Sequence, residues 1–273
     1  MPNYPLATSR IFENSFLAEE LKFNENSNKA FVYTINLTNC NDLILPHTIH
    51  KFWQCLSTDE KSRATKYYTK QLSDQYIISH GILRYILSYY TSQFPQNIEF
   101  TYNEYGKPFL KNNSHNIQFN MSHSHGVIAY IITLNYQVGI DIELHDDSLN
   151  IQELIDLIFT QAEYKFFTTL KDKEKLKFFY NLWTKKESLI KANGRGLSYP
   201  INTIEAMILT FDRKIFLASK ENNYDQAWYY FPLEVPKNYS GAIAIEHKIN
   251  KIIYLEMNNQ RNTFDNIRLK YFH

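Results

Sequence analysis

The apolar residues of this chain change their period twice, and the order of those changes limits the folds open to it. Residues 57–94 carry apolar side chains at helical spacing, and residues 98–144 then have the pattern of short strands separated by turns. A second helical stretch at 159–193 is again followed by strands, up to about residue 256. Two successive rounds of helix and sheet predict an α+β fold with two halves that meet near residue 137.

We therefore divide the 273 residues into four parts. The length suits one large domain or two of ordinary size, so a substantial core can form. No repeat of residues relates the two halves, and any internal symmetry has to be sought in three dimensions. The parts are a polar lead-in at 1–30, an N-terminal half at 31–136, a C-terminal half at 137–258 and a tail at 259–273.

Composition argues against several classes of protein. A net charge of +1 provides no overall positive field of the kind that nucleic-acid binding needs. Cys40 and Cys55 lie outside any CxxC pattern, which argues against a disulfide framework or a zinc site. The N-terminus lacks a signal-peptide pattern, and the longest apolar run, 127–132, is too short for a bilayer. We expect a cytoplasmic protein that binds neither nucleic acid nor membrane.

Two acids share one face of the predicted strand VGIDIE at 138–143. Side chains alternate along a strand, so Asp141 and Glu143 point to one face, and Gly139 lies on that same face. Neighbouring carboxylates repel each other unless water, a basic group or a cation offsets the repulsion. Gly139 leaves room for something to approach the backbone beside them. A bound hard cation would account for this pattern.

A third acid, Glu187, lies in WTKKESLIK at the border of the buried face of the second long helix. Taken alone, it is an ordinary i, i+4 partner of Lys191, a pair worth about 0.2–0.5 kcal/mol. Together with Asp141 and Glu143 it could instead complete a Mg²⁺ site, where water and substrate phosphate fill the other positions. That alternative implies a phosphorylated ligand.

Basic side chains are available for such a ligand in two sets. The first set surrounds Glu187. The second falls at i, i+3 and i+7 of the first predicted helix, which would place its members on one stripe. By charge pattern alone this stripe is a solvated face, and only an anionic ligand would change that interpretation. The two sets are Lys185, Lys186 and Lys191, and Arg63, Lys66 and Lys70.

Two loops add candidate phosphate ligands. Lys107 is held at the start of a strand by a turn that Gly106 and Pro108 enforce, although turn lysines are usually just exposed. Ser122 and His123 follow a strand, where a hydroxyl, an imidazole and free backbone N–H groups can bind phosphate.

Helix starts carry capping signals. Ser57 with Glu60, and Thr160 with Glu163, have the spacing of a cap and its partner. We therefore interpret Glu163 as a structural cap rather than as a catalytic acid.

The ordered motifs YGKP, FNMSHS, VGIDIE, FTQAEY and WTKKESLIKANGRGLS together resemble the 4′-phosphopantetheinyl transferases, specifically the larger surfactin-synthetase-activating type. The resemblance runs from about residue 56 to about residue 208, over half of the chain. Each motif is weak alone, whereas their order and spacing are specific.

The resemblance implies transfer of the phosphopantetheine arm from coenzyme A to a serine of an apo acyl or peptidyl carrier protein, releasing adenosine 3′,5′-bisphosphate. It implies that Asp141, Glu143 and Glu187 hold Mg²⁺ against the pyrophosphate, with Glu187 also acting as the base. Lys191 would contact the phosphates and act in catalysis. Further coenzyme contacts at matching positions would be Arg63, Lys66, Lys107, Ser122, His123 and Lys186.

The fold that the resemblance implies is a pseudo-dimer of two similar helix-plus-sheet halves, with the active site in the cleft between them. A chain of this length would work as a monomer. Two alternatives stay open. One is a catalytically silent relative that binds coenzyme A or carrier proteins, and the other is a Mg²⁺-dependent phosphohydrolase or nuclease, against which the net charge argues.

Overall fold

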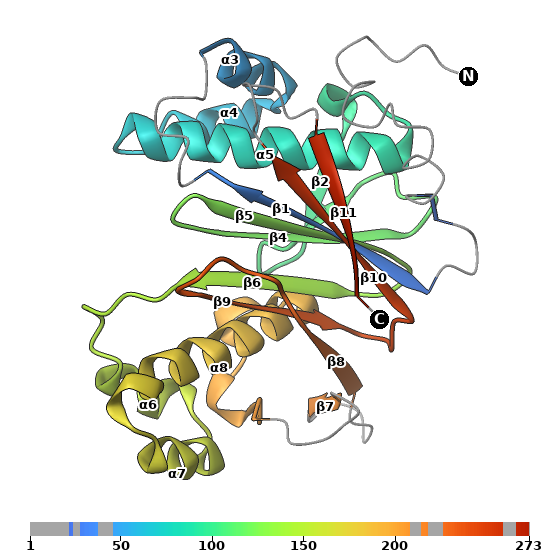
Figure 1. Ribbon diagram of the computed structural model, residues 1–273. Helices are drawn as coiled ribbons and strands as arrows, with labels where there is room; N and C mark the ends of the chain where they lie inside the picture. The colour runs from blue at the N-terminus through green and yellow to red at the C-terminus, as the bar shows by residue number, and fades with distance from the viewer. Residues whose placement is uncertain are drawn as a thin grey trace.

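The helices and sheets are stacked in four layers, with two sheets in the middle and a long helix on each outer side (Figure 1). Most of the predicted lead-in at 1–30 lies outside the described residues, as does Cys40. The computed structural model describes residues 22–23, 28–37, 46–207, 214–217, 226–258 and 266–272.

The elements follow the two rounds of helix and sheet that the sequence predicts. The first round contains β1 (Lys29–Asn36), α3 (Pro46–Cys55), α4 (Thr58–Ala64), α5 (Lys70–Thr91), η1 (Pro95–Asn97), β2 (Phe100–Tyr102), β3 (Pro108–Leu110), β4 (Ile117–Ser124) and β5 (Val127–Leu134). The second contains β6 (Val138–Leu144), α6 (Gln152–Ile158), α7 (Gln161–Thr169), α8 (Asp172–Asn193), η2 (Gly196–Ser198), η3 (Ile201–Thr203), β7 (Lys214–Leu217), β8 (Gln226–Pro232), β9 (Tyr239–Ile245), β10 (Lys251–Asn258) and β11 (Asn266–Phe272).

The two halves repeat one topology. In the first, β1 is followed by α5 and then by β4 and β5, which pair antiparallel in the order β1-β5-β4. In the second, β6 is followed by α8 and then by β8 and β9, which pair antiparallel in the order β6-β9-β8. This is the internal symmetry that the residues alone do not display. It confirms the predicted α+β pseudo-dimer.

The two C-terminal strands belong to the first sheet, and not to the C-terminal half and the tail in which the sequence analysis placed their residues. β10 pairs in parallel with β1, and β11 pairs antiparallel with β10, so both strands extend the first sheet. The predicted C-terminal half at 137–258 therefore loses residues 251–258, and the uninterpreted tail contains a strand at 266–272. Local period identifies a strand but not its partner, and a parallel partner can be far away in sequence.

The first helical stretch consists of two helices and not one. Ser57 and Glu60 form a reciprocal capping box at the start of α4, as their spacing predicts. α4 ends at Ala64, and α5 begins after Thr69, whose side chain accepts the N–H of Leu72. A threonine that caps in this way favours a new helix start.

The central strands are buried on both faces. In β1, Phe31 and Tyr33 belong to the core under α5, whereas Ala30 and Val32 face the second sheet. β5 alternates in the same way, which explains its continuous apolar run. Within the part of the chain that the structure describes, no helix is both long enough and apolar enough to cross a membrane.

Candidate active site at the junction of the two halves

β6 and α8 touch at main-chain level, and a glycine makes the contact possible. A Cβ on Gly139 would lie 1.9 Å from the carbonyl oxygen of Ser188 and 2.5 Å from the nitrogen of Ala192. The apolar residues of β6 belong to the core between the sheets, so its other face, with Asp141 and Glu143, turns towards α8. The room that Gly139 leaves is thus occupied by the backbone of α8.

Lys191 on α8 binds Asp141 on β6. Its Nζ lies 2.5 Å from Oδ1 of Asp141 and 3.0 Å from Oγ of Ser122. The Asp141 side chain is 2% exposed and that of Lys191 is 29% exposed, so this ion pair lies at the edge of the interior. Among the described residues Lys191 forms no ion pair with Glu187, and the simple i, i+4 pair considered from sequence is not made.

Three polar side chains of β4, spaced two residues apart, accept hydrogen bonds from three backbone N–H groups of β6. β6 is the edge strand of its sheet, and these bonds satisfy donors that have no neighbouring strand. The seam joins the two halves directly beside the acids. The pairs are Asn120 Oδ1 with Ile140, Ser122 Oγ with Ile142 and Ser124 Oγ with Leu144, at 3.0, 3.4 and 3.1 Å.

The same two serines bind the two acids of β6. Ser122 donates to Oδ1 of Asp141 at 3.0 Å, and Ser124 donates to Oε2 of Glu143 at 2.9 Å. The hydroxyl of Ser122 also accepts from Lys191, so its proton and both lone pairs are used within the protein. Sequence reasoning missed Asn120 and Ser124, although polar residues at every second position of FNMSHS were a usable signal.

The three acids share a partly buried space. Burial, followed by the charge of Asp141, raises the pKa of Glu187 to about 7, and Lys191 opposes the shift in part. Burial and then Asp141 also raise the pKa of Glu143. Asp141 and Glu143 each contribute to the raised pKa of Glu187, so the charges of both acids act on its carboxyl group.

One oxygen of Asp141 stands out. Its Oδ2 is buried and accepts no hydrogen bond from any residue that the structure describes, an arrangement that costs free energy unless a further group binds there. Within the described ranges no three His, Cys, Asp or Glu side chains form a ready-made group for a metal ion. The donor set still suits Mg²⁺, which prefers carboxylate oxygens and takes only a few of them from protein.

The N-terminal half contributes imidazole, guanidinium and aromatic groups. Burial and the charge of Lys191 lower the pKa of His123, which places its imidazole near that ammonium. His80 stacks on Tyr76 with the ring centroids 3.8 Å apart, and burial lowers its pKa to about 4. The guanidinium of Arg63 lies 5.7 Å from the ring centroid of Tyr102. Arg63 and Tyr102 are both exposed, and this pair suits a ligand with aromatic and anionic parts.

The remaining basic positions are dispersed. Because the helix is interrupted after Ala64, Arg63, Lys66 and Lys70 do not share a stripe. Lys66 is exposed, and Lys70 is ion-paired with Asp74.

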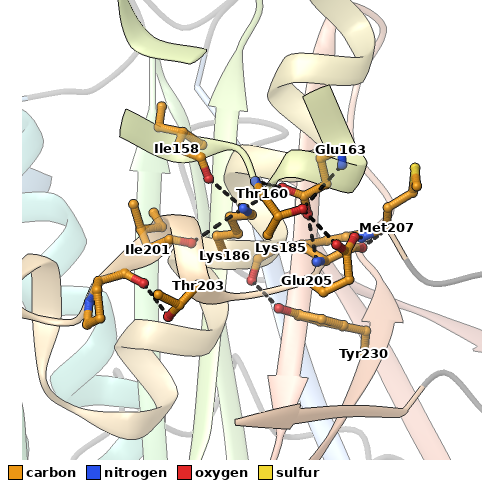
Figure 2. Close-up of polar contacts among 12 residues, drawn as sticks. Ile158, Thr160, Glu163, Lys185, Lys186, Ile201, Thr203, Glu205, Met207 and Tyr230 are labelled. Atoms are coloured by element: carbon orange, nitrogen blue, oxygen red, sulfur yellow. Dashed lines mark hydrogen bonds and ion pairs between the residues drawn. The ribbon is translucent and has the colours of Figure 1, made fainter. Parts of the chain in front are cut away.

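The structure overturns the prediction for Lys186, whose side chain lies among residues of the C-terminal half (Figure 2) and is fully buried. Its Nζ lies 2.6 Å from Oε2 of Glu163 and 2.5 Å from the carbonyl oxygen of Ile158. Glu163 also accepts the N–H groups of Thr160 and Ala206, which confirms it as a structural cap. A fully buried, paired ammonium cannot contact a phosphate, so Lys186 is removed from the predicted ligand set.

Lys107 is also buried, although lysines in turns are usually exposed. Its Nζ lies 2.6 Å from the carbonyl oxygen of Ala192 and 2.9 Å from Oε1 of Gln137. The structure therefore places this ammonium between the halves.

Comparison with known proteins covers both halves. A model described as the 4′-phosphopantetheinyl transferase superfamily matches residues 137–244, and one described as the N-terminal part of 4′-phosphopantetheinyl transferase matches residues 45–133. The two matches together span more than half of the chain. The protein belongs to the 4′-phosphopantetheinyl transferase superfamily.

Individual relatives support the same assignment. The chain is similar to 4′-phosphopantetheinyl transferase HetI of Nostoc sp. (strain PCC 7120), 33% identical over 145 residues, covering 52% of this chain and 61% of that protein. It is similar to 4′-phosphopantetheinyl transferase Sfp of Bacillus subtilis (strain 168), 26% identical over 197 residues, covering 72% and 85% respectively. The match to 4′-phosphopantetheinyl transferase gsp of Aneurinibacillus migulanus is 40% identical over 109 residues, 40% of this chain and 43% of that protein. The match to HetI thus spans about three fifths of that relative.

Proposed function

We propose that this protein transfers the 4′-phosphopantetheine arm of coenzyme A to a serine of an apo acyl or peptidyl carrier protein, releasing adenosine 3′,5′-bisphosphate. The names of its relatives support a phosphopantetheinyl transferase. The observation that carries the proposal is the contact between Lys191 and Asp141 at the junction of the halves, with Glu143 and Glu187 around it.

Mg²⁺ is proposed as the metal, held by Asp141, Glu143 and Glu187. Two observations support this set. Oδ2 of Asp141 accepts no hydrogen bond from the described residues, and burial with the charge of Asp141 raises the pKa of the other two acids, which a nearby cation would offset. When bound, the ion would neutralise charge on the pyrophosphate of coenzyme A.

The proposed step transfers the arm directly from coenzyme A to the carrier serine. The serine oxygen of the carrier forms a bond to the phosphorus nearer the pantetheine, and the bond from that phosphorus to the bridging oxygen breaks. The electron pair of the broken bond leaves with adenosine 3′,5′-bisphosphate. The serine proton passes to the carboxylate of Glu187, which acts as the general base. Lys191 offsets the charge that develops on the phosphate oxygens.

The N-terminal half would supply the nucleotide contacts. Arg63, Lys66 and His123 are the proposed ligands there, supported by the contact of the exposed Arg63 with Tyr102 and by the effect of Lys191 on the pKa of His123. We also propose that the enzyme works as a monomer, because both walls of the site come from one chain. The proposed compartment is the cytoplasm.

The test is incubation of the purified protein with coenzyme A, Mg²⁺ and a panel of apo carrier proteins, followed by intact-mass measurement. The proposal predicts that at least one carrier gains one phosphopantetheine arm and that adenosine 3′,5′-bisphosphate appears in equal amount. Binding of coenzyme A without any mass gain would indicate a silent relative. Release of the nucleotide without carrier modification would indicate a phosphohydrolase.

A further inference from the structure

The C-terminal end of α8 is closed by a turn from the other half of the molecule. The turn at 103–107 connects β2 with β3, and two of its side chains reach the helix. Nδ2 of Asn103 lies 2.7 Å from the carbonyl oxygen of Gly194, and Nζ of Lys107 lies 2.6 Å from that of Ala192. Gly194 packs against both side chains, since a Cβ there would lie 3.0 Å from Asn103 Nδ2 and 3.1 Å from Lys107 Cδ.

A helix end needs such partners. The last carbonyl groups of an α-helix accept no hydrogen bond from the helix itself, and together they form the negative end of the helix dipole. Gly194, with φ of 80°, closes α8 by returning its N–H to the carbonyl of Ile190. Asn103 and Lys107 then supply a neutral and a cationic donor to the neighbouring carbonyls, as a helix C-terminus prefers.

The turn itself is rigid for a local reason. Oδ1 of Asn103 accepts the backbone N–H groups of Tyr105 and Lys107, while its Nδ2 points at Gly194. One amide side chain therefore shapes the turn with one end and binds α8 with the other.

Lys107 ties the helix to the first residues of β6 as well. Its Nζ reaches Oε1 of Gln137 at 2.9 Å and the carbonyl oxygen of Val138 at 3.5 Å. Burial lowers the pKa of Lys107 to about 8, and the charge of Glu246 opposes the shift. All of these acceptors belong to the protein, so the ammonium is used to join the two elements that carry the acids and Lys191.

We propose that Asn103 and Lys107 are positioning residues, which cap α8 from the opposite half and thereby hold Lys191 against Asp141. They act through α8, and they need not touch the coenzyme. The consequence for catalysis rests on the proposed function, whereas the consequence for the helix does not.

The test uses Asn103→Asp in the full-length protein. An aspartate keeps the Oδ1 acceptor that shapes the turn, but it replaces the donor to Gly194 by a second acceptor at the negative end of the helix. Asn113→Asp is the matched control, because Asn113 also accepts a turn N–H and donates to a carbonyl, both of Ile117, without reaching α8. Hydrogen exchange at the amides of 190–194 and steady-state kinetics are measured in both variants.

The proposal predicts about tenfold faster exchange at 190–194 in Asn103→Asp, with α5 unchanged and the control at the wild-type rate. It also predicts a fall in kcat of several-fold with the KM for coenzyme A within about twofold, because catalytic geometry is disturbed and uniform binding is not. Unchanged exchange at 190–194 would overturn the proposal whatever the activity. If neither variant nor wild type transfers the arm, the proposed function fails while the exchange result still decides the cap.

Lys107→Met provides a second test, with Lys111→Met as its control. Methionine keeps most of the buried stem and removes the ammonium, and Lys111 lies on the same hairpin in an exposed pair with Glu99. Faster exchange at 190–194 with a fall in kcat supports the cap. A large rise in the KM for coenzyme A with unchanged exchange would show that Lys107 is a coenzyme ligand and contradict the proposal.

Discussion

Gly139 lies against Ser188 so closely that a Cβ on the glycine would come within 1.9 Å of the serine carbonyl oxygen. The strand that carries Asp141 and the helix that carries Lys191 are therefore spaced by main chain and not by side chains. This spacing sets the distance over which the two charged groups meet.

Gly139→Ala should separate β6 from α8. Backbone atoms of Ser188 cannot move aside alone, so the whole helix must shift, and we expect a loss of about 1–3 kcal/mol in the free energy of unfolding. Transfer activity should fall more steeply than stability, because Lys191 moves with the helix. Urea unfolding and the intact-mass assay check this. Gly196→Ala is a control without a clash, since nothing lies within 4 Å of the Cβ it would add and its only cost is the left-handed φ of 54°.

Asp141→Ala and Glu187→Ala should both reduce transfer by at least about 100-fold, yet differ in stability. Removing Asp141 takes the acid partner from Lys191 and an acceptor from Ser122, so we expect a cost of about 1–3 kcal/mol. Removing Glu187 relieves repulsion and should leave stability equal or higher. Thermal unfolding of the purified variants measures the difference. Full activity in either variant would contradict the assigned roles.

Glu187→Gln should stabilise the metal-free protein in a pH-dependent way. The pKa of Glu187 is about 7 in the fold, against an ordinary value of 4.5 in the unfolded chain, so between these two pH values the folded state binds a proton that the unfolded state does not. Its charge therefore destabilises the protein fully above pH 7, and this cost disappears as the pH falls towards 4.5. We expect the variant to be more stable by on the order of 1–3 kcal/mol at pH 8, with no gain near pH 4.5. A pH-independent difference would argue against the shifted group.

Lys186→Met should lower the free energy of unfolding of the protein without altering coenzyme binding. Its partner Glu163 is 0% exposed and would be left as an unpaired buried charge, at a cost of roughly 3–5 kcal/mol. Lys175→Met is the control, because its pair with the exposed Asp172 should contribute little. Urea unfolding gives the stabilities. If Lys186→Met kept wild-type stability but raised the KM for coenzyme A, the buried-pair assignment would be wrong.

Local patterns predicted much of the architecture. Alternation in VGIDIE placed Asp141 and Glu143 on one face, and the capping-box spacing of Thr160 and Glu163 identified a real helix start. The two rounds of helix and sheet became two halves of identical strand order. These features depend on neighbouring residues, which a sequence displays directly.

Long-range partners could not be predicted in the same way. The pairing of β10 with β1 joins the two ends of the chain, and no local period specifies it. Lys186 follows Lys185 and precedes Glu187 in sequence, yet the turn of the helix directs its ammonium to Glu163. Lys107 also has a distant partner: its ammonium is buried against α8 of the other half, which the local turn pattern could not indicate.

A crystal structure with coenzyme A and Mg²⁺ tests the central claim most directly. We predict one ion at about 2.0–2.1 Å from Oδ2 of Asp141, the oxygen that has no hydrogen-bond partner among the described residues. Glu143 and Glu187 should be among its direct or water-bridged ligands, and the pyrophosphate should complete the coordination sphere. An ion bound to the pyrophosphate with none of these three carboxylates in contact, directly or through water, would contradict the account.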